Sequence, residues 1–220
     1  MPTHKLTCSK PTENTYLFPT SESDGSTAQS ASVALDPTTG AVRGLVGRVG
    51  GTSDTTFRNF NYATQGKRSP GSTIKPLVVY APALASGWSI NKDLPNKPID
   101  YNGYTPTNYG GVETEDVPMY QALANSYNIP AVYLFNQIGI QKGISYGQKF
   151  GLNFDNVPEE LGISLGGGVT ASPLQMAQAY ATFANGGEMN TAISSLKLKM
   201  PVVTLLLPIV RSLNVLSASQ

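Results

Sequence analysis

Hydrophobic and polar residues alternate over two short runs near the start of the chain, and turn-forming residues separate the runs. The segment SASVALDPTTGAVRGLVGRV covers residues 30–49 and has Asp-Pro-Thr-Thr-Gly at its centre. Alternation on both sides of such a turn is typical of a β-hairpin. We therefore predict two antiparallel strands in this segment.

Further along the chain, apolar residues recur with the three- and four-residue spacing of a helix. This spacing predicts helices over residues 72–86, 119–125, 130–137, 141–150 and 172–184. The last of these has Ser172 as a candidate N-cap, Pro173 suited to the first turn, and Asn-Gly-Gly as a stop signal. Residues 93–117 are rich in Asn, Tyr, Gly and Pro, which predicts a long loop.

The composition argues against several classes of function. A formal net charge of +1, with no stripe of Lys and Arg, offers no surface for nucleic acid. The single cysteine, Cys8, cannot form an internal disulfide, and no Cys/His cluster has metal-ligand spacing. We expect neither a metal nor a cofactor. The sole histidine, His4, lies in a polar stretch, so a serine enzyme built on this chain needs a lysine, tyrosine or carboxylate base.

The chain shows no signal or transmembrane segment of its own. Its N-terminus lacks the apolar region of a signal peptide. The longest apolar run, residues 201–210, is shorter than the roughly 20 residues that a spanning helix needs.

Candidate chemistry appears in the segment QGKRSPGSTIKP, residues 65–76, where Ser72 follows a Pro-Gly corner and Lys75 comes three residues later. A hydroxyl at a helix start lies near unpaired N–H groups, which can stabilise an oxyanion. A partly desolvated ammonium near the same helix end has a lowered pKa, so Lys75 can act as a neutral base. The structural alternative is that Ser72 is a plain N-cap and Lys75 a solvated side chain.

A second polar group, Ser126-Tyr127-Asn128, interrupts the predicted helices. Its structural alternative is a polar break in which Asn128 helps to cap the helix that begins at Pro130. Spacing alone does not decide, because SxxK and SxN also occur at Ser89 with Lys92, Ser194 with Lys197, Ser89 with Asn91, and Ser212 with Asn214. Only Ser72 both follows a Pro-Gly corner and precedes an apolar helical run.

Three blocks occur in order along the chain: PGSTIKP, ALANSYNIPAV and GGGVTASPLQMAQAYATFANGG. Their order and separation resemble the transpeptidase domain of penicillin-binding proteins, whose superfamily carries the SxxK motif. The sequence looks most like a class A, bifunctional protein of Gram-positive type. ALDPTTGAVRGLVG resembles the family's opening hairpin, and YTPTNYGG resembles its loop before the second motif. The likeness covers about residues 28–187.

The resemblance implies a mixed α/β fold, with an antiparallel sheet flanked by helices as in penicillin-binding transpeptidases and β-lactamases. A helical subdomain would carry Ser126 and Asn128. Residues 1–24 would be a polar tail or linker, and residues 25–190 the N-terminal and central part of the transpeptidase domain. Residues 191–220 would be an aberrant, out-of-frame tail, so that the domain is incomplete.

The resemblance also implies roles for these residues. Ser72 would attack the carbonyl of the penultimate D-Ala of a peptidoglycan stem peptide, or that of a β-lactam, and Lys75 would take its proton. Ser126 would pass a proton to the departing amine, while Asn128, with Tyr127 beside it, would bind the substrate. An amine of a neighbouring stem would then resolve the acyl-enzyme and form a crosslink.

The family's third motif, Lys-Thr-Gly or a close variant on an edge strand, does not occur after Gly187. Because loss of one oxyanion donor typically costs about 10²–10³ in rate, we question the catalytic competence of the chain as it stands. With suitable codons, ISSLKLKMPVV at residues 193–203 reads FISKIENASG in a shifted frame, which is similar to what the family carries after this helix. We hypothesise a frameshift near residue 190.

Function is therefore expected to be that of a D-alanyl-D-alanine transpeptidase domain. The alternatives are a related acyl-serine hydrolase, namely a D,D-carboxypeptidase or β-lactamase, and a non-catalytic β-lactam-binding fragment. The expected partners are peptidoglycan stem peptides and β-lactam antibiotics. By resemblance, the parent protein would lie at the outer face of the cytoplasmic membrane and contact the membrane only through an N-terminal anchor that this chain lacks.

Overall fold

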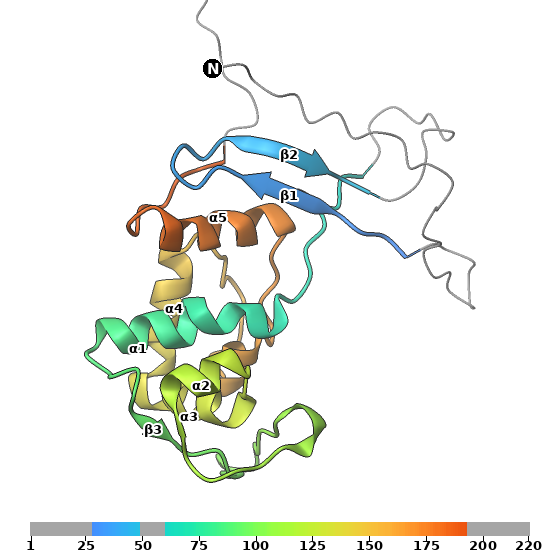
Figure 1. Cartoon of the computed structure of the whole chain (residues 1–220). Coiled ribbons are helices and arrows are strands. Elements are labelled where there is room, and N and C mark those ends of the chain that lie inside the picture. The colour runs from blue at the N-terminus through green and yellow to red at the C-terminus, as the bar shows by residue number, and fades with distance from the viewer. Residues whose placement is uncertain (1–27, 49–59, 193–220) are drawn as a thin grey trace, which may run out of the picture.

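The computed structural model describes residues 28–48 and 60–192. In this part of the chain the structure is mixed α/β, with short antiparallel strands and several helices (Figure 1). The tail predicted at residues 1–24 and nearly all of the tail predicted at residues 191–220 lie outside the described residues. Among the described residues, no helix is both long enough and apolar enough to cross a bilayer.

The predicted hairpin is confirmed. Strand β1 (Ser32–Leu35) pairs antiparallel with strand β2 (Val42–Val46). Asp36 holds the turn, because its Oδ1 accepts hydrogen bonds from the N–H groups of Thr38 and Thr39 at 3.0 and 3.2 Å. Its Oδ2 accepts from Arg43, which lowers the pKa of Asp36 to about 2. The turn is thus held by contacts between near neighbours in the sequence.

A helical segment in three parts forms the centre of the molecule. It consists of the 3-10 turn η1 (Gly71–Ile74), the π-helical turn η2 (Pro76–Tyr80) and helix α1 (Ala81–Ala85). The predicted helix over residues 72–86 is therefore present, but its hydrogen-bonding pattern changes twice. Pro76 and Pro82 lack N–H groups, which interrupts a regular α-helical pattern. Fully buried side chains from this segment form the middle of the core: Ile74, Leu77, Val78, Val79 and Ala83.

The other helices surround this central segment. They are α2 (Met119–Ala124), α3 (Asn128–Ile138), α4 (Ile140–Lys149), the 3-10 turn η4 (Leu161–Leu165) and α5 (Pro173–Ala184). Three of the predicted helices are confirmed to within one residue at each end. The prediction that a helix begins at Pro130 is wrong, because α3 begins at Asn128.

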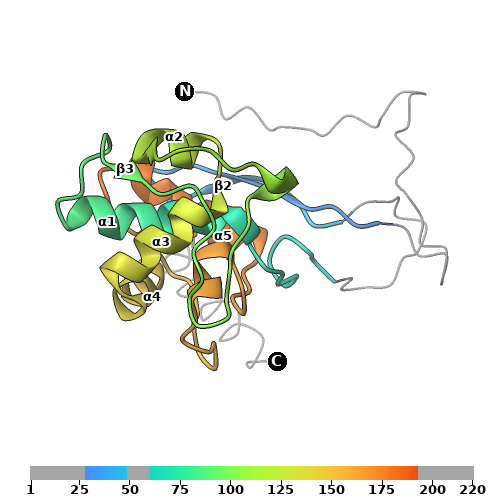
Figure 2. The same cartoon turned by 90° about the horizontal axis from the view of Figure 1, so that it is seen from below.

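The hairpin and α5 lie together, and the remaining helices lie on the other side of α5 (Figure 1). Seen from below, the hairpin passes behind the helices and extends beyond them (Figure 2). The expected mixed α/β fold, with an antiparallel sheet and helices, is confirmed. The N-terminal end of the central segment lies between α5 and the helical subdomain, which is formed by α2 and α3.

The long loop predicted over residues 93–117 has an ordered base. Strand β3 (Asp93–Leu94) pairs antiparallel with β4 (Val117–Pro118), and the loop between them includes the 3-10 turn η3 (Tyr109–Gly111). Two buried asparagines of the loop, Asn96 and Asn108, are hydrogen-bonded to each other. The loop is therefore held together internally by a buried polar contact.

Helix α4 packs unusually closely on the central segment, because it presents glycine to its neighbours. A Cβ atom at Gly143 would clash with the ring of Phe135 and lie 2.8 Å from the carbonyl oxygen of Val78. At Gly147, a Cβ atom would lie 2.5 Å from the ring of Phe154. Neither glycine has a positive φ, so it is space rather than backbone conformation that calls for glycine here.

The replacement Gly143→Ala tests this packing. In a helix, alanine is favoured over glycine by about 1 kcal/mol, but overpacking costs about 1–3 kcal/mol, so we expect the free energy of unfolding to fall by about 1 kcal/mol. Thermal unfolding followed by circular dichroism measures the change. Ser145→Ala, at an exposed position of the same helix, is the control and should leave stability equal or slightly higher. A Gly143→Ala protein as stable as the original would contradict the close approach.

Candidate active site

The Pro70-Gly71 corner delivers the chain into the turn that carries Ser72. Gly71 has φ +53°, a left-handed conformation that favours glycine. The corner packs on the loop after η4, where a Cβ atom at Gly166 would lie 2.7 Å from the Gly71 nitrogen. Ser69 joins the two loops, since its Oγ donates to the Gly166 carbonyl at 2.8 Å and accepts from the Gly71 N–H at 3.2 Å. The corner is therefore held from both sides.

Ser72 lies within η1 with its side chain exposed. The residue at the N-cap position is Pro70, and no side chain caps this turn. Within the described residues, the Ser72 hydroxyl makes no hydrogen bond. The alternative that Ser72 is a plain N-cap is therefore wrong. By contrast, Ser172 does cap α5, in a reciprocal capping box with Gln175.

Helix α5 is tied directly to the turn that carries Ser72. The hydroxyl of Tyr180 donates to the backbone carbonyl of Thr73 at 2.7 Å. The Thr73 hydroxyl in turn donates to the carbonyl of Pro70 at 2.5 Å. These bonds fix the backbone on both sides of Ser72, so the exposed hydroxyl is carried by a constrained turn.

Lys75 is buried, with 1 % of its surface exposed. Its Nζ lies within hydrogen-bond distance of four oxygen atoms from the second motif: the Ser126 carbonyl at 2.7 Å, the Asn128 Oδ1 at 2.7 Å, the Ser126 Oγ at 3.2 Å and the Tyr127 carbonyl at 3.2 Å. Burial lowers the pKa of Lys75 to about 8. The alternative that Lys75 is a solvated side chain is wrong.

The second motif begins at the break between α2 and α3. Ser126 has φ +54°. Its N–H donates to the Leu123 carbonyl, and the Tyr127 N–H donates to the Ala122 carbonyl, both at 3.0 Å. This pair of bonds is the Schellman arrangement, in which the left-handed position is usually glycine. A serine at such a position adds backbone strain, and it brings both the carbonyl and the hydroxyl of Ser126 to Lys75.

Tyr127 and Asn128 meet Lys75 in different ways. Tyr127 contributes its backbone carbonyl, while its half-buried ring packs against the hydrophobic core. Asn128 contributes its side chain, whose Oδ1 faces Lys75 and whose Nδ2 donates to the Thr107 carbonyl at 2.8 Å. As the first residue of α3, Asn128 is not the cap that the structural alternative required.

The cap of α3 comes from a residue that the sequence reasoning missed. Asn108, from the loop between β3 and β4, accepts hydrogen bonds from the N–H groups of Asn128 and Ile129. Its segment, YTPTNYGG, was singled out only for its resemblance to the family. A buried asparagine cannot be told from an exposed one by composition.

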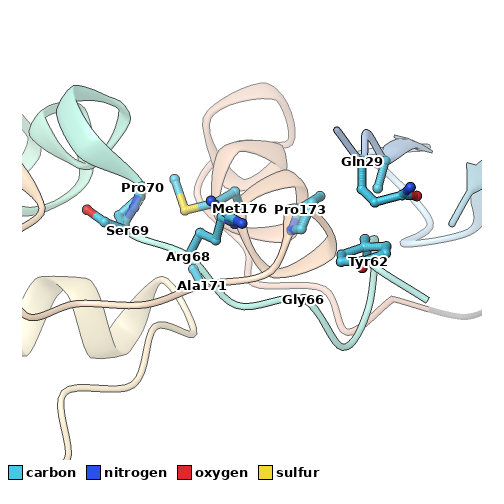
Figure 3. Close-up of a pocket in the computed structure, with 10 residues that line it drawn as sticks. Gln29, Tyr62, Gly66, Arg68, Ser69, Pro70, Ala171, Pro173 and Met176 are labelled. Carbon is cyan, nitrogen blue, oxygen red and sulfur yellow. The ribbon is translucent and has the colours of Figure 1, made fainter. Parts of the chain in front are cut away.

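The structure thus brings Lys75, Ser126, Tyr127 and Asn128 into contact. Ser72 precedes Lys75 by three residues in the same helical segment, and the Lys75 N–H donates to the Ser72 carbonyl. Within the described residues, no hydrogen bond joins the Ser72 hydroxyl to any of these four residues. A cavity of about 270 Å³ adjoins the corner before Ser72. Ser69 and Pro70 lie at one end of this cavity, and Tyr62 and Gln29 at the other (Figure 3).

The chemistry that this arrangement allows is acid–base chemistry on a hydroxyl. A lysine with a pKa of about 8 can give and take protons near neutral pH. Within the described residues, no group of three or more His, Cys, Asp or Glu side chains is placed to hold a metal ion.

Comparisons with known proteins agree with one another. The family model described as "Penicillin binding protein transpeptidase domain" matches residues 30–195. Penicillin-binding protein 2a of Streptococcus pneumoniae is 59 % identical over 181 residues, which is 82 % of this chain and 25 % of that protein. Penicillin-binding protein 1A of Neisseria flavescens is 39 % identical over 166 residues, which is 72 % of this chain and 20 % of that protein.

The fold comparison gives the same family. The crystal structure of penicillin-binding protein 1A from Haemophilus influenzae superposes with a TM-score of 0.68 at 30 % identity, covering 76 % of this chain and 25 % of that one. The chain therefore spans a quarter or less of the length of these relatives. The family predicted from the three ordered motif blocks is confirmed: the chain belongs to the penicillin-binding protein transpeptidase family.

Proposed function

We propose that this chain carries the acyl-transfer chemistry of a D-alanyl-D-alanine transpeptidase, with Ser72 as the nucleophile and Lys75 as its base. The observation that carries the proposal is the buried Lys75 amine, which contacts four oxygen atoms of residues 126–128 and has a pKa of about 8. An ordinary surface lysine stays protonated at neutral pH. At pH 7, about a tenth of the molecules would carry the neutral amine when the pKa is about 8.

The proposed reaction has two steps. Neutral Lys75 takes the proton of the Ser72 hydroxyl, and the oxygen attacks the carbonyl of the penultimate D-Ala of a stem peptide, or the carbonyl of a β-lactam. The N–H of Ser72 is in the first turn of its helical segment, where N–H groups lack helical partners, and would donate to the oxyanion. As the C–N bond breaks, the leaving nitrogen receives a proton through Ser126. Asn128 would hold the substrate amide.

In the second step an amine of a neighbouring stem attacks the acyl-serine ester, which releases Ser72 and forms the crosslink. The partners proposed are accordingly peptidoglycan stem peptides and β-lactam antibiotics. The parent protein is proposed to work at the outer face of the cytoplasmic membrane, where it would meet peptidoglycan.

Covalent labelling tests the nucleophile and the base. The full 220-residue chain is incubated with a fluorescent penicillin and separated on a denaturing gel. Ser72→Ala should abolish labelling, and Lys75→Ala should reduce it at least about 10²-fold, because the base is lost. Ser89→Ala and Lys92→Ala are matched controls: this pair has the same spacing, both side chains are exposed, and labelling should be unchanged.

Labelling of the Ser72→Ala protein at the original rate would show that another residue is the nucleophile. The same sample separates the rival functions. Stoichiometric, slow labelling favours the transpeptidase, whereas fast turnover of a chromogenic β-lactam favours a hydrolase. A well-folded protein that forms no adduct would support the non-catalytic fragment and sink the proposed reaction.

The rate of labelling should rise with pH. Burial lowers the pKa of Lys75 to about 8, so the neutral base increases about tenfold between pH 7 and pH 9. Rates measured across this interval should follow a single titration, with the Ser72→Ala protein as the blank for direct alkaline reaction. A rate that does not change with pH would show that Lys75 does not titrate in this range.

Ser126→Gly should separate stability from activity. Glycine removes the strain at φ +54° and should raise the free energy of unfolding by about 0.5–1 kcal/mol. Loss of the hydroxyl should slow acylation about 10²-fold. Ser126→Ala is the matched control, with a similar loss of acylation but no gain in stability. Acylation at the original rate in both proteins would exclude a role for this hydroxyl.

A further inference from the structure

One carboxamide in the loop between β3 and β4 holds the beginning of α3. Asn108 is buried, with 4 % of its surface exposed. Its Oδ1 accepts hydrogen bonds from the N–H groups of Asn128 at 2.7 Å and Ile129 at 3.1 Å. These are the first two residues of α3, whose N–H groups have no partner inside the helix. Asn108 therefore acts as an N-cap supplied from 20 residues away in the sequence.

The other side of the Asn108 carboxamide is fully used as well. Its Nδ2 donates to the Val112 carbonyl and to the Oδ1 of Asn96, both at 2.7 Å. Asn96 is fully buried, and its own Nδ2 donates to the Thr114 hydroxyl at 2.7 Å. With two donors facing the oxygen and two acceptors facing the nitrogen, the Asn108 amide has only one orientation that satisfies its neighbours.

The same loop also orients the side chain of Asn128. The Thr107 carbonyl accepts from Asn128 Nδ2 at 2.8 Å, which leaves Oδ1 facing Lys75 at 2.7 Å. Consecutive residues of the loop thus hold both the side chain and the backbone of Asn128. All four oxygen atoms around the Lys75 amine belong to residues 126–128, so the position of this segment decides what the amine contacts.

We propose that Asn108, supported by Asn96, is a positioning residue for acyl transfer: it fixes the segment 126–128 against the Lys75 amine. The inference rests on the proposed function, because it assigns the segment and the amine to that reaction. Asn108 contacts neither Ser72 nor Lys75 through any hydrogen bond, so its effect passes through Asn128. A shift of the segment of about 1 Å is enough to slow a reaction about 10²-fold.

The test uses two replacements of Asn108 in the full 220-residue chain. Asn108→Leu keeps the number and branching of the side-chain heavy atoms and loses all four hydrogen bonds. Asn108→Asp keeps an oxygen for the two N–H groups of α3, but it loses the two donated bonds and places its second oxygen against two acceptors. Asn185→Leu is the control, because Asn185 makes three side-chain hydrogen bonds of its own, to Pro37 and Glu188, at the C-terminal end of α5.

Three measurements are made on each protein: the rate of acylation by a fluorescent penicillin, the melting temperature, and amide hydrogen exchange of residues 126–131. Asn108→Leu should slow acylation about 10- to 100-fold and speed exchange in this segment. In Asn108→Asp, the loss of acylation rate and the increase in exchange should both be smaller than in Asn108→Leu. Asn185→Leu should lower the melting temperature while acylation stays within about twofold of the original.

Acylation and exchange that are unchanged in Asn108→Leu would overturn the proposal. So would an equal loss of acylation in Asn185→Leu, because the effect would then follow stability alone. If Asn108→Leu does not fold, Asn108→Asp decides on the same two measurements. If the original chain forms no adduct at all, the proposed function fails. Faster exchange of residues 126–131 in Asn108→Leu than in the original chain would then still support the positioning of segment 126–128 by Asn108. Unchanged exchange would overturn it.

Discussion

The site depends on a single amine, that of Lys75, which is almost completely buried. Removing an ammonium from water is costly unless nearby groups replace its hydration. The oxygen atoms that do so for Lys75 come from residues 51 to 53 positions further along the chain. The central helical segment and the helical subdomain must therefore meet at this point, and the contact joins the two halves of the proposed machinery.

The backbone near Ser72 and Lys75 has unusual conformations and one very close approach. Ser126 accepts a left-handed conformation, Gly71 forms the corner before Ser72, and Gly166 leaves room for that corner. Each is tolerated because the neighbouring packing is tight, with the core of the central segment fully buried. Local strain supported by a rigid surround is a recurring property of functional sites.

Sequence reasoning succeeded where the determining contacts are local. The hairpin turn is held by Asp36 through residues two, three and seven positions away, and the start of α5 is held by a capping box three residues long. Contacts between residues so close in the sequence can be predicted from short sequence motifs. The start of α3 was placed two residues late because its cap, Asn108, lies in another loop.

The same distinction applies to the site. The spacing of Ser72 and Lys75 suggested a nucleophile and a base, yet it could not exclude a cap and a solvated lysine. Only the long-range contacts of Lys75 decide that it is buried, and only resemblance linked Ser126 and Asn128 to it beforehand. Asn96 and Asn108 gave no signal, since their burial is a property of the folded loop.

The number of acceptors around Lys75 exceeds what the amine can satisfy. An ammonium has three N–H groups, and four oxygen atoms lie within 3.2 Å of Nζ. When the amine is neutral, two N–H groups remain for the two oxygens at 2.7 Å, and its lone pair is free to accept. The Ser126 hydroxyl, at 3.2 Å, can then reverse its role and become a donor to nitrogen. Loss of one proton therefore changes the direction of this hydrogen bond without moving a heavy atom.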